Sequence, residues 1–415
     1  MAMKESGIEW VGLIPDTWSV IPNKYVMHKE KNLCEKWTSE DVMSLTMNGV
    51  IVRDLQNPTG KMPATFDGYQ YIEDGDLLMC LFDIDVTPRC VGKVTHNGVT
   101  SPAYSNFKVH DNASRDYFYY YYLMVDNTKE LLHLAKNLRH SFTEEQLGQL
   151  KVPMPPLSEQ QAIADYLDET CSQIDEIIAE AKASIDEYKE LKQSVIFEAV
   201  TKGLNKNVEM KDSGIEWIGE IPVDWVVKKF KYVATVNTNL VSPIGYEDYH
   251  QIAPDCIEKD SGRIIKERTV SEAGIESWNQ LFKQGQLIYS KIRPTLNKVI
   301  IAPYDGLCSA DMYPLDVHEN IYFVQFAMLS KYFVGQVGLI TQDRVKMPKI
   351  NQDELSNVYV AVPEKTEQKE IVDWLNVQLP KYDSLIAEKE SLINDLEAYK
   401  KSLIYEVVTG KRRVV

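Results

Sequence analysis

Lysines and arginines gather with amide side chains in a few short segments of the chain. The clearest are SKIRPTLNK (290–298) and QDRVKMPKINQDEL (342–355); PTGKMP, TPRCVGK and NLRHSFTEEQL lie in the first half. Lys and Arg bind phosphates and guanine edges, and Asn or Gln suit adenine, so such loops could read a major groove. A solvated surface charge is the alternative explanation for each residue. The candidates are Lys61, Arg89, Lys93, Arg139, Lys291, Arg293, Asn297, Lys298, Arg344, Lys346 and Lys349.

Segments that could carry catalysis fail on composition or spacing. Gly60-Lys61 and Gly410-Lys411 lack the further glycine and the Ser/Thr of a phosphate-binding loop. PDCIEK (254–259) is similar to a nuclease motif, but its Glu and Lys are adjacent, so in a strand they point to opposite faces. SPAY (101–104) lacks the second proline of an amino-methyltransferase loop. The six cysteines form no CxxC pair. We therefore expect no catalytic residue and no metal site.

The elements that must position these loops occur twice. Residues 3–26 return at 210–233 with 15 of 24 positions identical, and residues 155–203 return at 363–411. The offsets, 207 and 208 residues, indicate a tandem duplication rather than a solenoid repeat. Each half contains a short Trp/Pro segment, which we call the strap, then a variable stretch and a long helix.

The variable stretches share turn signals that separate short runs of Val, Ile, Tyr and Thr, followed by a helical pattern. We therefore expect an α+β fold class, with two globular domains of one scaffold that carry different surface residues. The predicted boundaries are a first domain with its strap (1–154), a first long helix (155–203), a linker with the second strap and second domain (204–362), and a second long helix with a basic tail (363–415).

Apolar residues recur at alternating spacings of three and four in both long helices, which predicts an antiparallel coiled coil about 60 Å long. Lys192, Lys389 and Lys400 interrupt the stripe. Ile177, Leu191, Leu385 and Leu392 lie beside it, where they could either widen the core or face a partner. The stripe residues include Ile163, Leu167, Ile174, Ile178, Ile185, Val195, Ile371, Leu375, Ile386, Ile393, Leu396 and Leu403.

The net charge of −16 at first argues against a nucleic-acid partner. However, residues 158–200 carry 11 acids and 3 bases, and residues 364–408 carry 10 acids and 6 bases. Most of the acidity therefore lies on the predicted helices, and the rest of the chain is nearly neutral and can present basic patches. We find no apolar run long enough to span a bilayer and no secretion signal, so we expect a cytoplasmic protein without a membrane partner.

The motifs SGIEWVGLIPDTW, SGIEWIGEIPVDW, LSEQQAIADYLD, TEQKEIVDWLN and SKIRPTLNK jointly resemble the DNA-specificity subunit of type I restriction-modification systems, over the whole chain. The resemblance implies a non-catalytic subunit whose two target-recognition domains each read half of a split double-stranded DNA sequence. It also implies two methyltransferase partners that bring S-adenosylmethionine and adenine-N6 chemistry, while this chain binds no cofactor. The resemblance leaves open whether restriction-translocase subunits are further partners. The biological role that it implies is phage defence.

The resemblance also bears on individual residues. SPAY resembles a segment of recognition domains in this family, which adds Tyr104 to the DNA-binding candidates. The first domain has MCLFDIDVTPR where the second has SKIRPTLNK. Helices of about 60 Å would separate half-sites of about 3 to 5 base pairs by a gap of about 5 to 8. The alternative function is a coiled-coil scaffold or an acidic DNA mimic, without sequence-selective binding.

Overall fold

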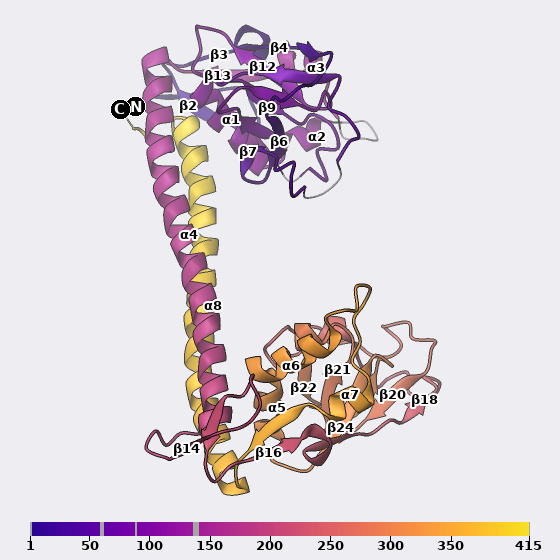
Figure 1. Ribbon diagram of the computed structural model, residues 1–415. Helices are drawn as coiled ribbons and strands as arrows, with labels where there is room; N and C mark the ends of the chain where they lie inside the picture. Colours follow the sequence, from indigo (N-terminus) through magenta and orange to yellow (C-terminus); the bar gives the residue numbers. More distant parts are fainter. Residues whose placement is uncertain (1, 59–61, 88, 136–140, 415) are drawn as a thin grey trace. The chain divides into compact units, whose positions relative to one another are not determined.

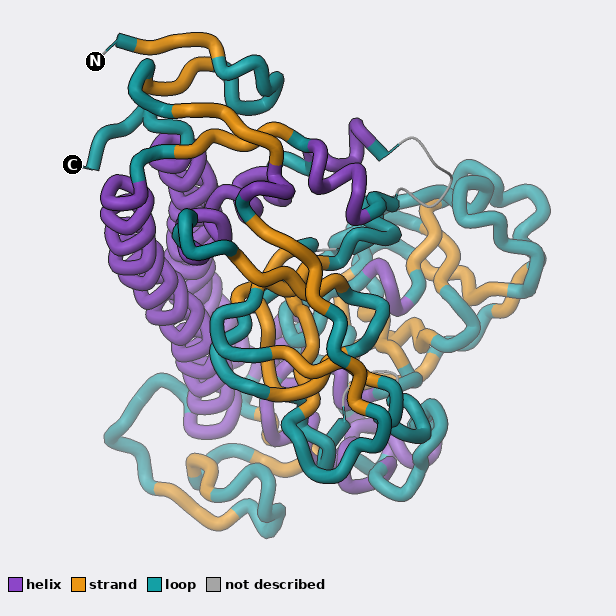
Figure 2. Tube along the Cα trace, turned by 90° about the horizontal axis from the view of Figure 1, so that it is seen from above, coloured by secondary structure: helices purple, strands orange, loops and turns teal. Residues whose placement is uncertain are grey.

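The computed structural model describes residues 2–58, 62–87, 89–135 and 141–414. It divides into two compact units, each described by itself below. Unit 1 comprises Met1–Ala181 and Ser391–Val415, and unit 2 comprises Lys182–Glu390. Figure 1 labels the elements of both units, and Figure 2 shows that their strands are short and joined by long loops. Among the described residues no single helix is long and apolar enough to cross a membrane. The helices α5 (Ile321–Leu329) and α6 (Lys331–Thr341), bent by 60° at the break between them, meet that test only as a pair.

Unit 1 contains a four-stranded sheet in the order β10-β9-β12-β4, a five-stranded sheet in the order β5-β8-β11-β6-β7, and the ribbons β1-β2 and β13-β3. In the larger sheet β11 pairs antiparallel with β8 and parallel with β6. The strands are β1 (Met3–Glu5), β2 (Leu13–Pro15), β3 (Ser19–Pro22), β4 (Met27–Glu30), β5 (Leu33–Cys34), β6 (Val42–Thr46), β7 (Gly49–Val52), β8 (Tyr69–Ile72), β9 (Leu77–Met79), β10 (Val91–Lys93), β11 (Gly98–Thr100), β12 (Ser105–Val109) and β13 (Lys151–Met154).

Unit 2 repeats this topology except for the edge strand β7, with sheets β17-β24-β21-β22 and β18-β20-β23-β19 and ribbons β14-β15 and β16-β25. Here β23 pairs antiparallel with β20 and parallel with β19, as β11 does with its neighbours. The shared strand order confirms one scaffold used twice. The strands are β14 (Met210–Asp212), β15 (Glu220–Pro222), β16 (Val226–Lys229), β17 (Ala234–Val236), β18 (Leu240–Val241), β19 (His250–Ile252), β20 (Asn279–Phe282), β21 (Leu287–Ser290), β22 (Val299–Ile301), β23 (Gly306–Cys308), β24 (Met312–Val317) and β25 (Tyr359–Val362).

Four of the short helices that the structure describes, α1, α3, α5 and α7, begin at side-chain caps. Ser114 caps α1, Asn320 caps α5, and Thr143 and Asn351 form capping boxes at α3 and α7, which satisfy otherwise unpaired amides. The helices are α1 (Arg115–Asn127), α2 (Glu130–Leu134), α3 (Glu144–Gln149), α4 (Leu157–Lys202), α5 (Ile321–Leu329), α6 (Lys331–Thr341), α7 (Gln352–Ser356) and α8 (Lys365–Val408), with 3-10 turns η1 (Asn23–Tyr25), η2 (Phe230–Tyr232), η3 (Pro254–Cys256) and η4 (Pro294–Leu296).

Within each unit the first part of one long helix packs antiparallel against the last part of the other, which confirms the predicted coiled coil. Unit 1 buries the start of α4 against the end of α8, and unit 2 buries the start of α8 against the end of α4. The buried stripe residues are Ile163, Leu167, Ile174, Ile178 and Leu403 in unit 1 and Ile185, Ile371 and Leu375 in unit 2; the half-buried ones are Ile393 and Leu396 in unit 1 and Val195 and Ile386 in unit 2.

Ion pairs fill two interruptions in the stripe. In unit 1 Lys400 of α8 reaches Asp175 of α4 at 2.6 Å, and in unit 2 Lys192 of α4 reaches Asp383 of α8 at 2.6 Å. The duplication relates these pairs, because the lysines and the aspartates each stand 208 residues apart. A charged pair at a stripe position favours one register of the two helices over others.

Candidate nucleic-acid interface

The two basic segments of unit 2 meet in space, and we call 290–298 together with 342–350 the basic loop pair. Residues 290–298 connect β21 to β22, and residues 342–350 lead from α6 to α7. A bridge joins Ile292 to Lys349, and the Ile350 amide donates to the Lys291 carbonyl at 2.9 Å. Both segments carry DNA-binding candidates predicted from the sequence, and the fold brings them to one surface.

Within 290–298 the side chains differ in their freedom. Arg293 is exposed at a left-handed φ of 44°, and the described residues offer its guanidinium no hydrogen bond or ion pair. The Lys291 ammonium lies 5.2 Å from the ring centre of Tyr313. Lys298 donates to the carbonyl of Pro254 at 2.5 Å, and Asn297 is buried beside Asp260, whose pKa is raised by burial. Arg293 is therefore the side chain most available for a ligand in this segment.

Within 342–350 one arginine is structural. The Arg344 guanidinium contacts both carboxylate oxygens of Glu354 and also the carbonyl of Lys349. The hydrogen bond from Arg344 lowers the pKa of Glu354. Lys349 pairs with Asp311 at 2.9 Å, whereas Lys346 is exposed. Arg344 thus fixes the loop, and Lys346 projects from it.

The described candidates of unit 1 are held inside the domain. Arg89 donates to the carbonyls of Val91 and Met47 and to the Tyr119 hydroxyl, at 3.1, 2.7 and 2.7 Å. Tyr104 is half-buried, and burial raises the pKa of its hydroxyl. Lys61 and Arg139 lie outside the described residues.

Lys93 points toward the long helix of unit 1. It pairs with Asp116 at 2.8 Å and with Asp168 of α4 at 3.7 Å. Burial acts to raise the pKa of Asp116, but hydrogen bonds from Lys93 and Arg115 outweigh it and lower the pKa. These contacts come from tertiary packing, so spacing in the sequence gave no sign of them. DNA contact by all twelve candidates stays a prediction.

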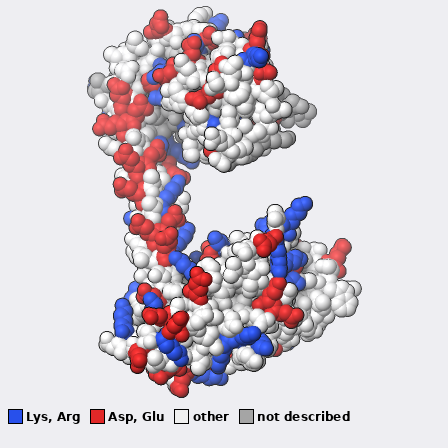
Figure 3. Space-filling view, in the orientation of Figure 1, with Lys and Arg blue, Asp and Glu red and all other residues white. Residues whose placement is uncertain are grey.

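Acidic and basic side chains lie on different parts of the molecule. On the face drawn in Figure 3, acidic side chains crowd the long helices, while lysines and arginines gather on part of unit 2. No group of three or more potential metal ligands occurs among the residues that the structure describes.

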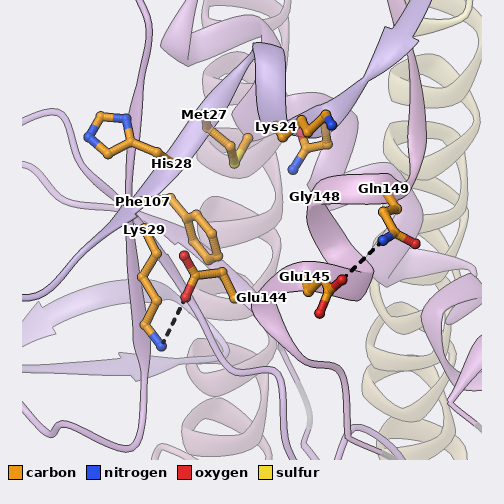
Figure 4. Close-up of a pocket in the computed structure, with 10 residues that line it drawn as sticks. Lys24, Met27, His28, Lys29, Phe107, Glu144, Glu145, Gly148 and Gln149 are labelled. Carbon is orange, nitrogen blue, oxygen red and sulfur yellow. Dashed lines mark hydrogen bonds and ion pairs between the residues drawn. The ribbon is translucent and has the colours of Figure 1, made fainter.

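A pocket of about 310 Å³ in unit 1 lies between η1, β4 and α3 (Figure 4). Met27 and Phe107 form an apolar wall, and Lys29 approaches Glu144 to 3.9 Å. Asn23 also lines the pocket, and its side-chain amide oxygen Oδ1 is buried without a hydrogen-bond partner among the described residues. The duplication places Phe230 at the position of unit 2 that is equivalent to Asn23. The ring of Phe230 packs against the ring of Phe333, with 5.6 Å between the ring centres. The two domains therefore differ in their interiors as well as in their loops.

A Glu-Gln pair at the start of each long helix attaches the domain to that helix, a role that was not predicted from the sequence. In unit 1 the Trp18 indole donates to Glu159 at 3.0 Å, while Gln160 accepts from the Ser114 amide at 2.7 Å and donates to the Pro155 carbonyl at 2.8 Å. We call this arrangement the Glu-Gln lock. Its signal was the EQ dipeptide repeated in both halves.

Unit 2 contains the same lock. Trp225 donates to Glu367 at 2.9 Å, and Gln368 accepts from the Asn320 amide at 2.8 Å and donates to the Pro363 carbonyl at 2.9 Å. Each lock joins a strap, a domain helix and a long helix, so each domain is held in a fixed orientation on the helix end that it contacts.

The chain is similar in sequence to known proteins. The family model described as "Type I restriction modification DNA specificity domain" matches residues 84–187 and 222–398, which is more than half of the chain. The EcoDI type I restriction enzyme specificity subunit of Escherichia coli is 31% identical over 268 residues, covering 61% of this chain and 60% of that protein. The MjaVIII specificity subunit of Methanocaldococcus jannaschii is 28% identical, covering 64% of this chain and 63% of that protein. The matches thus span less than two thirds of these relatives' length.

Two solved structures share the fold at low identity. A chain from work on complex assembly and conformational transition of the type I R-M system matches 96% of this chain and 99% of that one, with a TM-score of 0.69 and 11% identity. The HsdS subunit from Thermoanaerobacter tengcongensis matches 96% of this chain and 98% of that one, with a TM-score of 0.50 and 12% identity. The family model, which matches more than half of the chain, shows that the chain belongs to the family of type I restriction-modification DNA specificity proteins, and the duplicated sheets agree with that assignment.

Proposed function

We propose that this chain is a non-catalytic subunit that reads a split double-stranded DNA target and positions methyltransferase subunits on it. The duplication carries the proposal: two domains share one strand order and one lock to the long helices, but present different loops. A protein that recognises two unrelated half-sites needs one scaffold with two sets of surface residues. Adenine-N6 methylation with S-adenosylmethionine would then be the work of the partners.

Mapping adenine methylation across the source genome, with and without this chain, tests the proposal. We expect one bipartite motif to lose methylation when the chain is removed, and an Arg293→Glu chain to fail to restore it. The matched control is Lys283→Glu, because Lys283 is exposed outside the basic loop pair and pairs only with Asp305 among the described residues. An unchanged map would contradict the proposal and favour the scaffold or DNA mimic.

The long helices would set the gap between the half-sites. The 46 residues of α4 correspond to about 70 Å of helix, or about two turns of B-DNA. Inserting seven residues after Ala183 and seven at the equivalent point of α8, after Ser391, keeps the stripe in phase and adds about 10 Å. We expect the motif gap to widen by about three base pairs with the half-sites unchanged. Altered half-site bases at the old gap would contradict the ruler.

Exposed apolar residues on the long helices offer a surface for the methyltransferase partners. Ile177 and Leu191 of α4 are 44% and 50% exposed, and Leu385 and Leu392 of α8 are 37% and 38% exposed. The fold therefore leaves these residues outside the core, and we propose that partner helices cover them. Leu392→Glu should abolish co-purification of the methyltransferase, whereas the neighbouring Asn394→Glu should not. Unchanged co-purification of the Leu392→Glu chain would contradict this surface.

A further inference from the structure

The tip of the loop between α6 and α7 presents two apolar side chains to solvent. Val345 is 95% exposed and Met347 is 52% exposed, with exposed Lys346 between them. We call these three residues the tip. A single exposed apolar side chain is ordinary on a protein surface. At the tip, however, the backbone adds a second observation that points to a ligand.

Met347 adopts a left-handed φ of 53°, although it has a long side chain. That conformation costs a non-glycine residue about 1–2 kcal/mol, and such strain persists where the surroundings enforce it, commonly at binding sites. A glycine would give the same turn without the strain. The presence of a methionine at this strained position favours a role for its side chain.

The residues that flank the tip are held firmly, and the hold does not involve the tip itself. Arg344 is fixed by Glu354 before the tip. After the tip, the Pro348 carbonyl accepts from the Arg293 amide at 2.7 Å, and Lys349 is bridged to Ile292. The tip is therefore a rigidly mounted projection rather than a loose loop, and it loses little conformational entropy on binding.

Cations free to bind phosphates stand next to this apolar tip. Arg293 and Lys346 are both exposed, and the described residues offer their side chains no hydrogen bond or ion pair. DNA presents a matching surface, because the thymine 5-methyl group projects into the major groove between two rows of phosphates.

We propose that the tip enters the major groove of the half-site read by unit 2, with Val345 against a thymine 5-methyl group and Met347 against the adjoining base edge. Arg293 and Lys346 then contact the flanking phosphates. For Arg344 this proposal replaces the predicted DNA contact by a positioning role, because its guanidinium is held by Glu354. This inference rests on the proposed function, whose adenine chemistry supplies at least one A·T pair, and hence one thymine, in each half-site.

The direct test removes the methyl group and the valine separately and together. The assembled complex binds duplexes of the mapped target in which each thymine of the unit 2 half-site is replaced in turn by uracil. At one position we expect uracil to weaken wild-type binding about fourfold, the value for one buried methyl group. Val345→Ser should weaken binding to the thymine duplex about tenfold and abolish that uracil effect. If no uracil position is coupled to Val345, the proposal is refuted.

Two further variants separate side-chain contact from loop conformation. Met347→Gly removes the side chain and suits the left-handed turn, so affinity should fall severalfold while the melting temperature stays level or rises. Unchanged affinity would refute the contact by Met347. Val226→Ser, at a 49% exposed position on β16, is the matched control and should leave affinity unchanged.

Salt dependence distinguishes a phosphate contact from a positioning role. Arg293→Gln should reduce the slope of log K against log salt by about one, because one phosphate contact is lost. Arg344→Gln should weaken discrimination between target and random duplex and leave that slope unchanged. A reduced slope for Arg344→Gln would refute its positioning role. If the wild-type complex shows no sequence preference, the proposed function itself fails, which is a different result from an uncoupled Val345.

Discussion

Replacing Gln160 by leucine tests the Glu-Gln lock quantitatively. Gln160 is fully buried and satisfies the Ser114 amide and the Pro155 carbonyl. Leucine has a similar size but can neither accept nor donate, so both backbone groups would be left buried and unpaired. Each such group costs about 1–3 kcal/mol, and we expect a total loss of about 3 kcal/mol in the free energy of unfolding. For a unit of this size the melting temperature should fall by about 6–12 °C.

Scanning calorimetry and urea unfolding are the assays, with Gln161→Leu as the matched control. Gln161 is the next residue, is exposed, and donates only to Asp165 on its own helix at 2.8 Å among the described partners. The control should therefore change the free energy of unfolding by less than about 0.5 kcal/mol. Gln368→Leu should cost unit 2 at least as much, because Gln368 also donates to Glu319 at 3.0 Å. Equal losses for Gln160→Leu and Gln161→Leu would refute the lock.

Burial raises the pKa of Glu367 despite the hydrogen bond from Trp225. The stability of the wild type relative to Glu367→Gln should therefore be greatest below about pH 4 and should fall as the pH rises through the raised pKa. Urea unfolding from pH 4 to 8 measures this difference. A pH-independent difference would contradict this. Lys192→Leu leaves Asp383 without its ion-pair partner and should destabilise unit 2 by about 1–3 kcal/mol, as measured by thermal unfolding. The double variant with leucine at both positions should recover most of the lost stability. No recovery would argue against a stabilising ion pair. Gly410→Ala puts a Cβ 2.5 Å from a strap proline at a φ of 71° and should cost at least about 1 kcal/mol, with Gly148→Ala, which meets only ordinary contacts, as control.

The long helices were predictable because their spacing of apolar residues is a local pattern that occurs in both halves of the sequence. Spacings of three and four identified stripe residues such as Ile163 and Leu375, and the fold buries them. The repeated offsets of 207 and 208 residues indicated the shared scaffold, which the strand orders confirm, since they match apart from the additional edge strand β7 of unit 1. Whether Ile177 and Leu191 lay in a widened core or on the surface could not be decided from spacing, because the answer depends on where the neighbouring helix ends its contact.

The loops were less predictable, because side-chain partners there come from distant parts of the chain. The sequence identified 290–298 and 342–355 as segments rich in Lys and Arg, and the fold places the two segments side by side. It gave no sign that Arg344 is occupied by Glu354, or that Arg89 is held by Tyr119. Positive charge identifies a candidate, but availability depends on tertiary contacts that spacing does not encode.

The division of the chain into units has a consequence for its biosynthesis. Unit 2 is one uninterrupted segment, Lys182–Glu390, but unit 1 needs Ser391–Val415, which leave the ribosome after all of unit 2. The Tyr117 hydroxyl, for example, donates to the carbonyl of Val408. At about 5–20 residues per second, the apolar stripe at the start of α4 waits about 10–40 seconds for its complement. Unit 1, which is encoded first, is therefore completed after unit 2, and during that interval its uncovered stripe is a target for chaperones and for association between nascent chains.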